Sequence, residues 1–179
     1  LRRNIDRMGY TSSFTIYDTS DSERLMKEVL KDMSLDDKTF PPKLVLSIIG
    51  RQKDQLISPE QMLEESRSAS DLRLPQIAKA YKVYQQRLKD NNALDFDDIL
   101  YVTVKLLQQE ADVREYYQHK FQYVLVDEYQ DTNHVQYLLT ALLAGKWGNI
   151  CVVGDDDQSI YRFRGATIEN ILSFEEQYP

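Results

Sequence analysis

Cysteine, histidine and long apolar runs are scarce in this sequence. Among its 179 residues there is a single cysteine, Cys151, so no disulfide can form within the chain, as expected in a reducing cytoplasm. No apolar run approaches the ~20 residues that a bilayer-spanning helix needs, and the amino end has no secretory pattern. His119 and His134 have no companion ligands at metal-binding spacing. The sequence therefore predicts a cytoplasmic protein without a membrane segment.

Positive charge is also in short supply, and the net charge is −7. That balance alone argues against a nucleic-acid-binding protein, but the average conceals an asymmetry. Residues 1–92 hold 16 Lys and Arg against 14 Asp and Glu, whereas residues 93–179 hold 6 against 15. The excess acid gathers at 127–131 and 155–157. Clustered carboxylates repel one another unless a metal, hydrogen bonds or solvent offset the repulsion, so both clusters need an explanation.

Residues from about 20 to 92 have the pattern of an all-helical region, with hydrophobic residues amounting to 42% of the chain and sufficient for a packed core. Helix starts are predicted by capping-box pairs and by prolines: Ser20 with Glu23, Pro41-Pro42, and Ser58 with Gln61. A longer helix carries an apolar stripe and ends near Asn91-Asn92: Ile77, Tyr81, Tyr84 and Leu88. Arg51 and Lys53 are candidates for contact with duplex DNA, and a solvated helix face explains them equally well.

The pattern changes to α/β after Asn92. Residues 95–98 lead into a helix, and short apolar runs at 123–126 and 150–153 predict two strands. A helix that ends at Gly145 separates the strands, and another is predicted over 166–177. This alternation is typical of a parallel sheet whose strands are buried on both faces, with Cys151 as a small apolar residue inside one of them.

Acidic side chains follow the first predicted strand directly. Asp127 and Glu128 would emerge at the carboxyl end of a parallel strand, where ligands bind in open α/β sheets. One carboxylate there can help to hold Mg²⁺, and the next can take a proton from an attacking water. The alternative is a strand that ends in a solvated acidic turn.

The segment after the second strand, 154–166, runs from an acidic turn through Gln158 to alternating aromatic and arginine residues. Tyr161 and Phe163 could stack on bases while Arg162 and Arg164 meet phosphates. Two core aromatics flanked by solvated arginines are the alternative for so short a stretch.

Both acidic segments resemble motifs of one family. Residues 126–132 resemble the Walker B box of superfamily 1 helicases, and 154–166 resemble motif III of the UvrD/PcrA/Rep type. The resemblance implies the following roles: Asp127 on Mg²⁺, through water; Glu128 activating the attacking water; Gln158 sensing the γ-phosphate; Tyr161 and Phe163 stacking on single-stranded DNA; Arg164 beside that DNA; and Gln130, Asp131, Gly154 and Asp155 supporting the motifs. Related sequences usually have Trp at the position of Phe163.

The resemblance also implies an organisation. Residues 1–9 would end a first segment of a RecA-like, P-loop NTPase type of α/β domain, 10–92 would form an inserted all-helical domain, and 93–179 would return to the RecA-like domain. The implied function is ATP-dependent 3′→5′ movement on single-stranded DNA with unwinding at a single-strand/duplex junction, in repair or replication, using ATP and Mg²⁺. Two alternatives stay open: the helicase subunit of a nuclease-helicase, or a non-catalytic DNA-binding scaffold.

Glycine is also scarce, with six residues in the chain. None belongs to a Gly-x-x-x-x-Gly-Lys-Ser/Thr pattern, whose backbone N–H groups and lysine would bind phosphates. The resemblance implies that this loop precedes Leu1, and the absence of an initiator Met fits a chain cut from a longer protein. The 179 residues by themselves are therefore expected to hydrolyse ATP negligibly.

Overall fold

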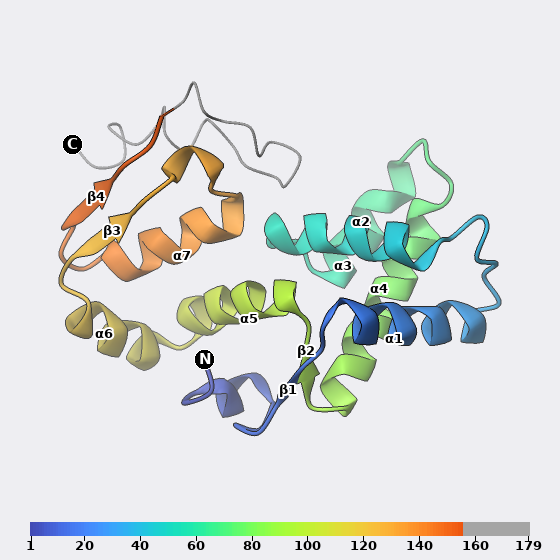
Figure 1. Ribbon diagram of the computed structural model, residues 1–179, viewed down its shortest axis with the longest axis horizontal. Coiled ribbons are helices and arrows are strands. Elements are labelled where there is room, and N and C mark those ends of the chain that lie inside the picture. The colour runs from blue at the N-terminus through green and yellow to red at the C-terminus, as the bar shows by residue number, and fades with distance from the viewer. Residues whose placement is uncertain (156–179) are drawn as a thin grey trace. The chain divides into compact units, whose positions relative to one another are not determined.

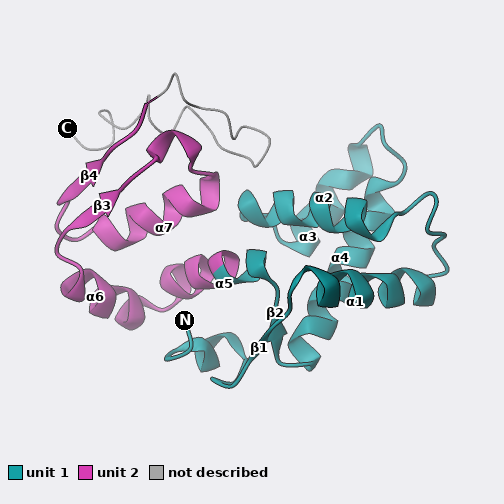
Figure 2. Cartoon of the chain, in the orientation of Figure 1, with its two compact units in different colours: residues 1–99 teal, residues 100–179 magenta. Residues whose placement is uncertain are grey.

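The computed structural model describes residues 1–155, and the chain divides into two compact units, 1–99 and 100–179 (Figure 2). The elements of unit 1 are η1 (Ile5–Met8), β1 (Thr15–Ile16), α1 (Thr19–Asp32), α2 (Pro42–Asp54), α3 (Pro59–Glu65), η2 (Ser66–Ser68), α4 (Leu74–Asp90) and β2 (Ala93–Leu94). Helix α5 (Phe96–Gln109) begins in unit 1 and continues into unit 2. The described elements of unit 2 are α6 (Ala111–Lys120), β3 (Val124–Val126), η3 (Tyr129–Asp131), α7 (His134–Ala144) and β4 (Ile150–Val152) (Figure 1). None of the helices in residues 1–155 is long and apolar enough to span a membrane.

Helices α1 to α4 confirm the predicted helical region and share one hydrophobic core. The α4 stripe lies inside it, with Tyr81 and Tyr84 fully buried. Full burial of a large apolar side chain contributes roughly 1.5–3 kcal/mol, so this stripe is a main source of the stability of the helical region. Helix α4 ends at Asp90 with Asn91 as its C-cap, as predicted.

Two of the predicted helix starts are confirmed and one is wrong. Ser58 caps α3 in a complete capping box with Gln61, and Pro42 occupies the first turn of α2. Helix α1, however, begins one residue before Ser20. Its N-cap is Asp18, whose Oδ1 accepts hydrogen bonds from the Asp21 amide at 2.9 Å and the Ser20 hydroxyl at 2.8 Å. The Asp18 carboxylate already accepts from the first turn, so Ser20 is a donor within that turn and not the cap.

The chain enters and leaves the helical region along a short parallel strand pair. Strand β1 pairs with β2 in the register Thr15 with Ala93 and Ile16 with Leu94. Asn92, in the left-handed region at φ 47°, accepts from the Thr11 amide at 2.8 Å and donates to the Thr11 hydroxyl at 2.7 Å. These bonds join segments that are about eighty residues apart in the sequence. The two ends of the helical region therefore lie side by side, joined by the β1–β2 pair and by the bonds between Thr11 and Asn92.

Strands β3 and β4 of unit 2 form the predicted parallel pair, in the register Val124 with Ile150 and Val126 with Val152. The prediction that both faces would be buried is wrong for the described residues. Leu125 is 78% exposed and Cys151 is also exposed, although Val124 and Val126 are half-buried. Side chains alternate along a strand, and α7 packs against β3, so helix cover reaches one set of side chains and leaves Leu125 and Cys151 uncovered.

Helix α7 ends where the sequence predicted, and its start, which was not predicted, is at His134. Asn133 and Gln136 form its capping box, and Gly145 is its C-cap. Trp147, just beyond the helix, donates its indole N–H to the Gln118 carbonyl of α6 at 2.7 Å. Helix α6 was not predicted. The helix predicted at 166–177 lies outside the described residues.

Candidate functional site

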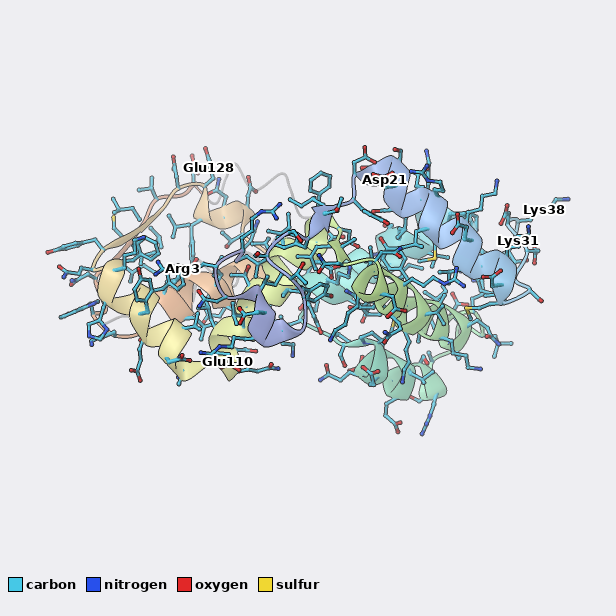
Figure 3. The ribbon with its side chains drawn as sticks, turned by 90° about the horizontal axis from the view of Figure 1, so that it is seen from below. Arg3, Asp21, Lys31, Lys38, Glu110 and Glu128 are labelled. Atoms are coloured by element: carbon cyan, nitrogen blue, oxygen red, sulfur yellow. The ribbon has the colours of Figure 1, made fainter. Side chains whose placement is uncertain are left out.

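The acidic pair lies where strand β3 ends. Asp127 and Glu128 are both exposed, and the Glu128 amide donates to Asp127 Oδ1 at 2.9 Å. Glu128, labelled in Figure 3, adopts the left-handed backbone conformation, with φ 51°. Such a conformation is uncommon for a residue with a side chain and is often found at functional sites. It turns the chain sharply from β3 into η3.

A buried glutamine holds the Glu128 side chain. Gln130 is 1% exposed, and its Nε2 donates to Glu128 Oε2 at 2.7 Å. Its Oε1 accepts from the Asp155 amide at 3.1 Å. The same amide group therefore contacts both segments that the sequence singled out. Gln130 was predicted only as a supporting position, since nothing in the sequence spacing shows which side chain joins residues twenty-five positions apart.

Backbone hydrogen bonds fasten the same two segments together. The Tyr129 amide donates to the Val153 carbonyl at 3.0 Å, and the Val153 amide donates to the Val126 carbonyl at 2.8 Å. Tyr129 is fully buried. In the next turn, the Asp131 amide donates to the Glu128 carbonyl at 2.9 Å. The carboxyl ends of β3 and β4 are thus a connected structure that exposes Asp127 and Glu128.

The residues present fit a magnesium ion that is bound mainly by water and phosphate. No group of three or more potential ligands gathers anywhere in residues 1–155, so no cage of protein side chains exists there. Asp127 instead offers an exposed carboxylate beside the strand end. Mg²⁺ commonly keeps several waters and takes one or two carboxylates together with substrate phosphates. The donor set therefore suits a metal that arrives with a nucleotide.

Four of the predicted site residues lie outside the described part of the chain: Gln158, Tyr161, Phe163 and Arg164. Their roles stay predictions. Gly154 and Asp155 are described and exposed, and Asp155 is joined to Gln130 as given above.

Lys53 corrects the sequence analysis. It is neither a DNA contact nor part of a solvated face, because it is 1% exposed and its ammonium lies 2.7 Å from Asp95 Oδ2 and 2.9 Å from Asp98 Oδ1. The two carboxylates hold the pKa of Lys53 well above its usual range, against the effect of burial. Arg51 is exposed, which is compatible both with a contact to duplex DNA and with a solvated helix face.

Comparison with known proteins shows the family of the chain. All 179 residues match the model of the UvrD/REP helicase N-terminal domain. The chain belongs to this helicase family. It is 50% identical over its whole length to the ATP-dependent DNA helicase PcrA of Staphylococcus epidermidis and 49% identical to that of Staphylococcus aureus. It spans 24% of the length of each of these relatives. The match confirms the family to which the two acidic segments were assigned.

Within the UvrD/REP family match, the described fold is mainly helical with two small parallel sheets. Both of the acidic segments fall inside the matched range. The segment 95–98, predicted to lead into a helix, supplies two buried carboxylates, Asp95 and Asp98. That buried ion-pair network is a feature that sequence reasoning missed.

Proposed function

We propose that this chain is the part of an ATP-dependent DNA helicase that contributes the magnesium-binding and water-activating carboxylates. The observation that carries the proposal is the linked pair of strand ends, where exposed Asp127 and Glu128 meet the beginning of the 154–166 segment through Gln130. Parallel strands bring their carboxyl ends to one edge, which is where nucleotides bind in α/β sheets. The two Staphylococcus relatives are named as ATP-dependent DNA helicases.

The proposed roles follow from chemistry and position. Asp127 would hold Mg²⁺, mostly through the water shell of the ion, and a bound ion would supply charge neutralisation at the phosphates. Glu128 orients a water and takes its proton as that water attacks. Its hydrogen bond to Gln130 Nε2 leaves Oε1 of the carboxylate to meet the water. Gln158 would contact the terminal phosphate.

Coupling to DNA is proposed for the segment 154–166. Gln158 and Tyr161 are only three residues apart in the sequence, so one short segment can join the state of the nucleotide to the grip on a base. Tyr161 and Phe163 would stack on single-stranded DNA, and Arg164 would lie beside it. The whole protein would translocate 3′→5′ and unwind a single-strand/duplex junction in the cytoplasm.

The proposed domain organisation is a RecA-like domain interrupted by a helical insertion. Three segments make it up: 1–9, 10–92 and 93–179. The parallel pairing of β1 with β2 and the bonds between Thr11 and Asn92 support the insertion, because they bring its two ends together. The parallel pairing of β3 with β4 supports the RecA-like assignment of the last segment.

ATP hydrolysis by the full-length protein tests the proposal. Turnover is measured with and without single-stranded DNA, in the wild type, in Glu128→Gln and in Glu115→Gln, which removes an exposed carboxylate of α6 in the same unit. We expect DNA-stimulated turnover that falls by at least about 100-fold in Glu128→Gln and is unchanged in Glu115→Gln. A folded wild type without turnover would leave a DNA-binding scaffold as the better account.

A further inference from the structure

Gln130 joins the proposed water-activating carboxylate to the segment that follows β4. We propose that it is a positioning residue, which makes the orientation of Glu128 depend on the position of the backbone at Asp155. This inference rests on the proposed function, since it assigns a regulator to the same site. It concerns a residue that would contact neither nucleotide nor DNA.

The side-chain amide of Gln130 has a fixed orientation. Nε2 faces a carboxylate oxygen of Glu128 at 2.7 Å, and Oε1 faces the backbone N–H of Asp155 at 3.1 Å. If the amide were turned over, an oxygen would face an oxygen and an NH₂ group would face an N–H. Only one orientation therefore satisfies both partners. Rotation of the Gln130 side chain away from Glu128 or from Asp155 would break one of these two hydrogen bonds.

Gln130 and Glu128 differ in burial. Gln130 is 1% exposed, and a buried amide that loses its hydrogen-bond partners destabilises the fold. Glu128 is exposed and has three side-chain torsions, so solvent would not hold it in one rotamer. The bond from the buried amide restricts that freedom. Buried Gln130 therefore sets the orientation of the exposed Glu128 side chain.

Backbone hydrogen bonds surround this link. The Tyr129 amide donates to the Val153 carbonyl at 3.0 Å, just before Gln130 and just before Gly154, and the Asp131 amide donates to the Glu128 carbonyl at 2.9 Å, just after Gln130. Gly154 and Asp155 are the first residues beyond that fixed point. A displacement of the backbone at Asp155 would therefore change the bond between the Asp155 amide and Gln130 Oε1. Gln158, proposed to sense the γ-phosphate, is three residues further along the sequence.

Two substitutions at position 130 test the inference in the full-length protein. Gln130→Met keeps the length of the side chain and removes both hydrogen bonds. Gln130→Glu keeps the acceptor for Asp155 and, when ionised, places a like charge against Glu128 where the donor was. We expect both to lower kcat for DNA-stimulated ATP hydrolysis by about 10- to 100-fold, with KM for ATP within about twofold of the wild type, because misplacing a catalytic group by an ångström has effects of that size.

The matched control is Gln136→Met. Gln136 is a half-buried glutamine of the same unit, and its Oε1 accepts from the Asn133 amide at 3.0 Å in the α7 capping box. It contacts neither Glu128 nor Asp155. We expect this variant to lower Tm while kcat per folded molecule stays at the wild-type value. A loss of kcat in Gln136→Met equal to that in Gln130→Met would overturn the inference, because it would show general loosening of unit 2.

The outcomes separate this inference from the proposed function. An inactive wild type, or Glu128→Gln at the wild-type rate, removes the proposed function itself. The positioning role alone is overturned if the wild type is active, Glu128→Gln has lost ATP turnover, and Gln130→Glu keeps the wild-type kcat. If Gln130→Met fails to fold, Gln130→Glu still decides, because its side chain matches glutamine in size. A 10- to 100-fold rise in KM for ATP with unchanged kcat in the position-130 variants would assign Gln130 to nucleotide binding. That result would also overturn the inference.

Discussion

Lys53 of α2 and Asp98 of α5 form an ion pair with no solvent access to either side chain, at 2.9 Å between Nζ and Oδ1. Asp95 adds a second carboxylate at 2.7 Å, and Tyr84 donates its hydroxyl to Asp95 Oδ2 at 3.1 Å. Gln85 Nε2 donates to Asp98 Oδ1 at 2.9 Å. The carboxylates also accept from each other's backbone amides, so every carboxylate oxygen has a donor. The network joins α2, α4 and the beginning of α5.

Removal of the lysine should be far more damaging than removal of an exposed one. Lys53→Ala leaves two buried carboxylates without a counter-charge, and we expect it to cost about 3–5 kcal/mol in the free energy of unfolding of unit 1. Hydrogen–deuterium exchange of the α2 amides in the full-length protein measures this loss. Adding Asp98→Asn to Lys53→Ala should recover part of it, because one unpaired charge disappears.

Lys43→Ala is the control for that loss. Lys43 also lies in α2, but it is 80% exposed and 3.7 Å from Glu23. An exposed pair of this kind contributes at most about 1 kcal/mol. Equal protection of the α2 amides in Lys53→Ala and Lys43→Ala would contradict the role that we assign to the buried network.

Asp54 should make unit 1 less stable as pH rises. Burial raises the pKa of this half-buried carboxyl to about 6, and the negative charge of Asp97 adds to the rise. An unfolded Asp has a pKa of about 3.9. Between about pH 4 and pH 6 the folded chain keeps a proton that the unfolded chain releases, so stability falls across that window and is constant above it.

Asp54→Asn should remove this dependence. Relative to wild type we expect the variant to gain about 1 kcal/mol at pH 7.5, after allowing for solvent screening of a half-exposed group, and to gain little at pH 4. Thermal unfolding at the two pH values measures the difference. Asp37→Asn, which neutralises an exposed loop carboxylate, is the control for overall charge. A gain in Asp54→Asn of the same size at both values would show that the effect is not titration of Asp54.

Local signals in the sequence were sufficient for most helices of the chain. Ser58 and Gln61 predicted the start of α3, and the α4 stripe predicted the buried face, because both depend on contacts within a few residues. The cap of α1 was misplaced because Asp18 and Ser20 are both good N-cap residues, and the pattern alone does not rank them. Helix α6 has weak amphipathic character, so its periodicity gave no signal.

Long-range partners were not predictable from the sequence. A lysine on a helix is usually solvated, and nothing near Lys53 shows that Asp95 and Asp98 lie against it from more than forty positions away. The same holds for Gln130, whose two partners lie on different segments. The composition of a strand likewise does not show which neighbours cover it, and so the exposure of Leu125 and Cys151 was missed. The motifs predicted candidate site residues, whereas the link between the two segments through Gln130 required the structure.

Phe163 provides a test of DNA stacking, although it lies outside the described residues. Stacking of one base on an aromatic side chain is worth about 1–3 kcal/mol, so Phe163→Ala should weaken binding of single-stranded DNA by roughly 5- to 150-fold in the full-length protein. Phe163→Trp should strengthen binding, because indole offers a larger π surface than phenyl. Fluorescence anisotropy with a labelled oligonucleotide at one fixed salt concentration measures the affinities. Phe121→Ala, which truncates a partly exposed aromatic at the end of α6, should bind like the wild type. Wild-type affinity in Phe163→Ala would assign that aromatic to the core of the protein and leave Tyr161 as the stacking candidate.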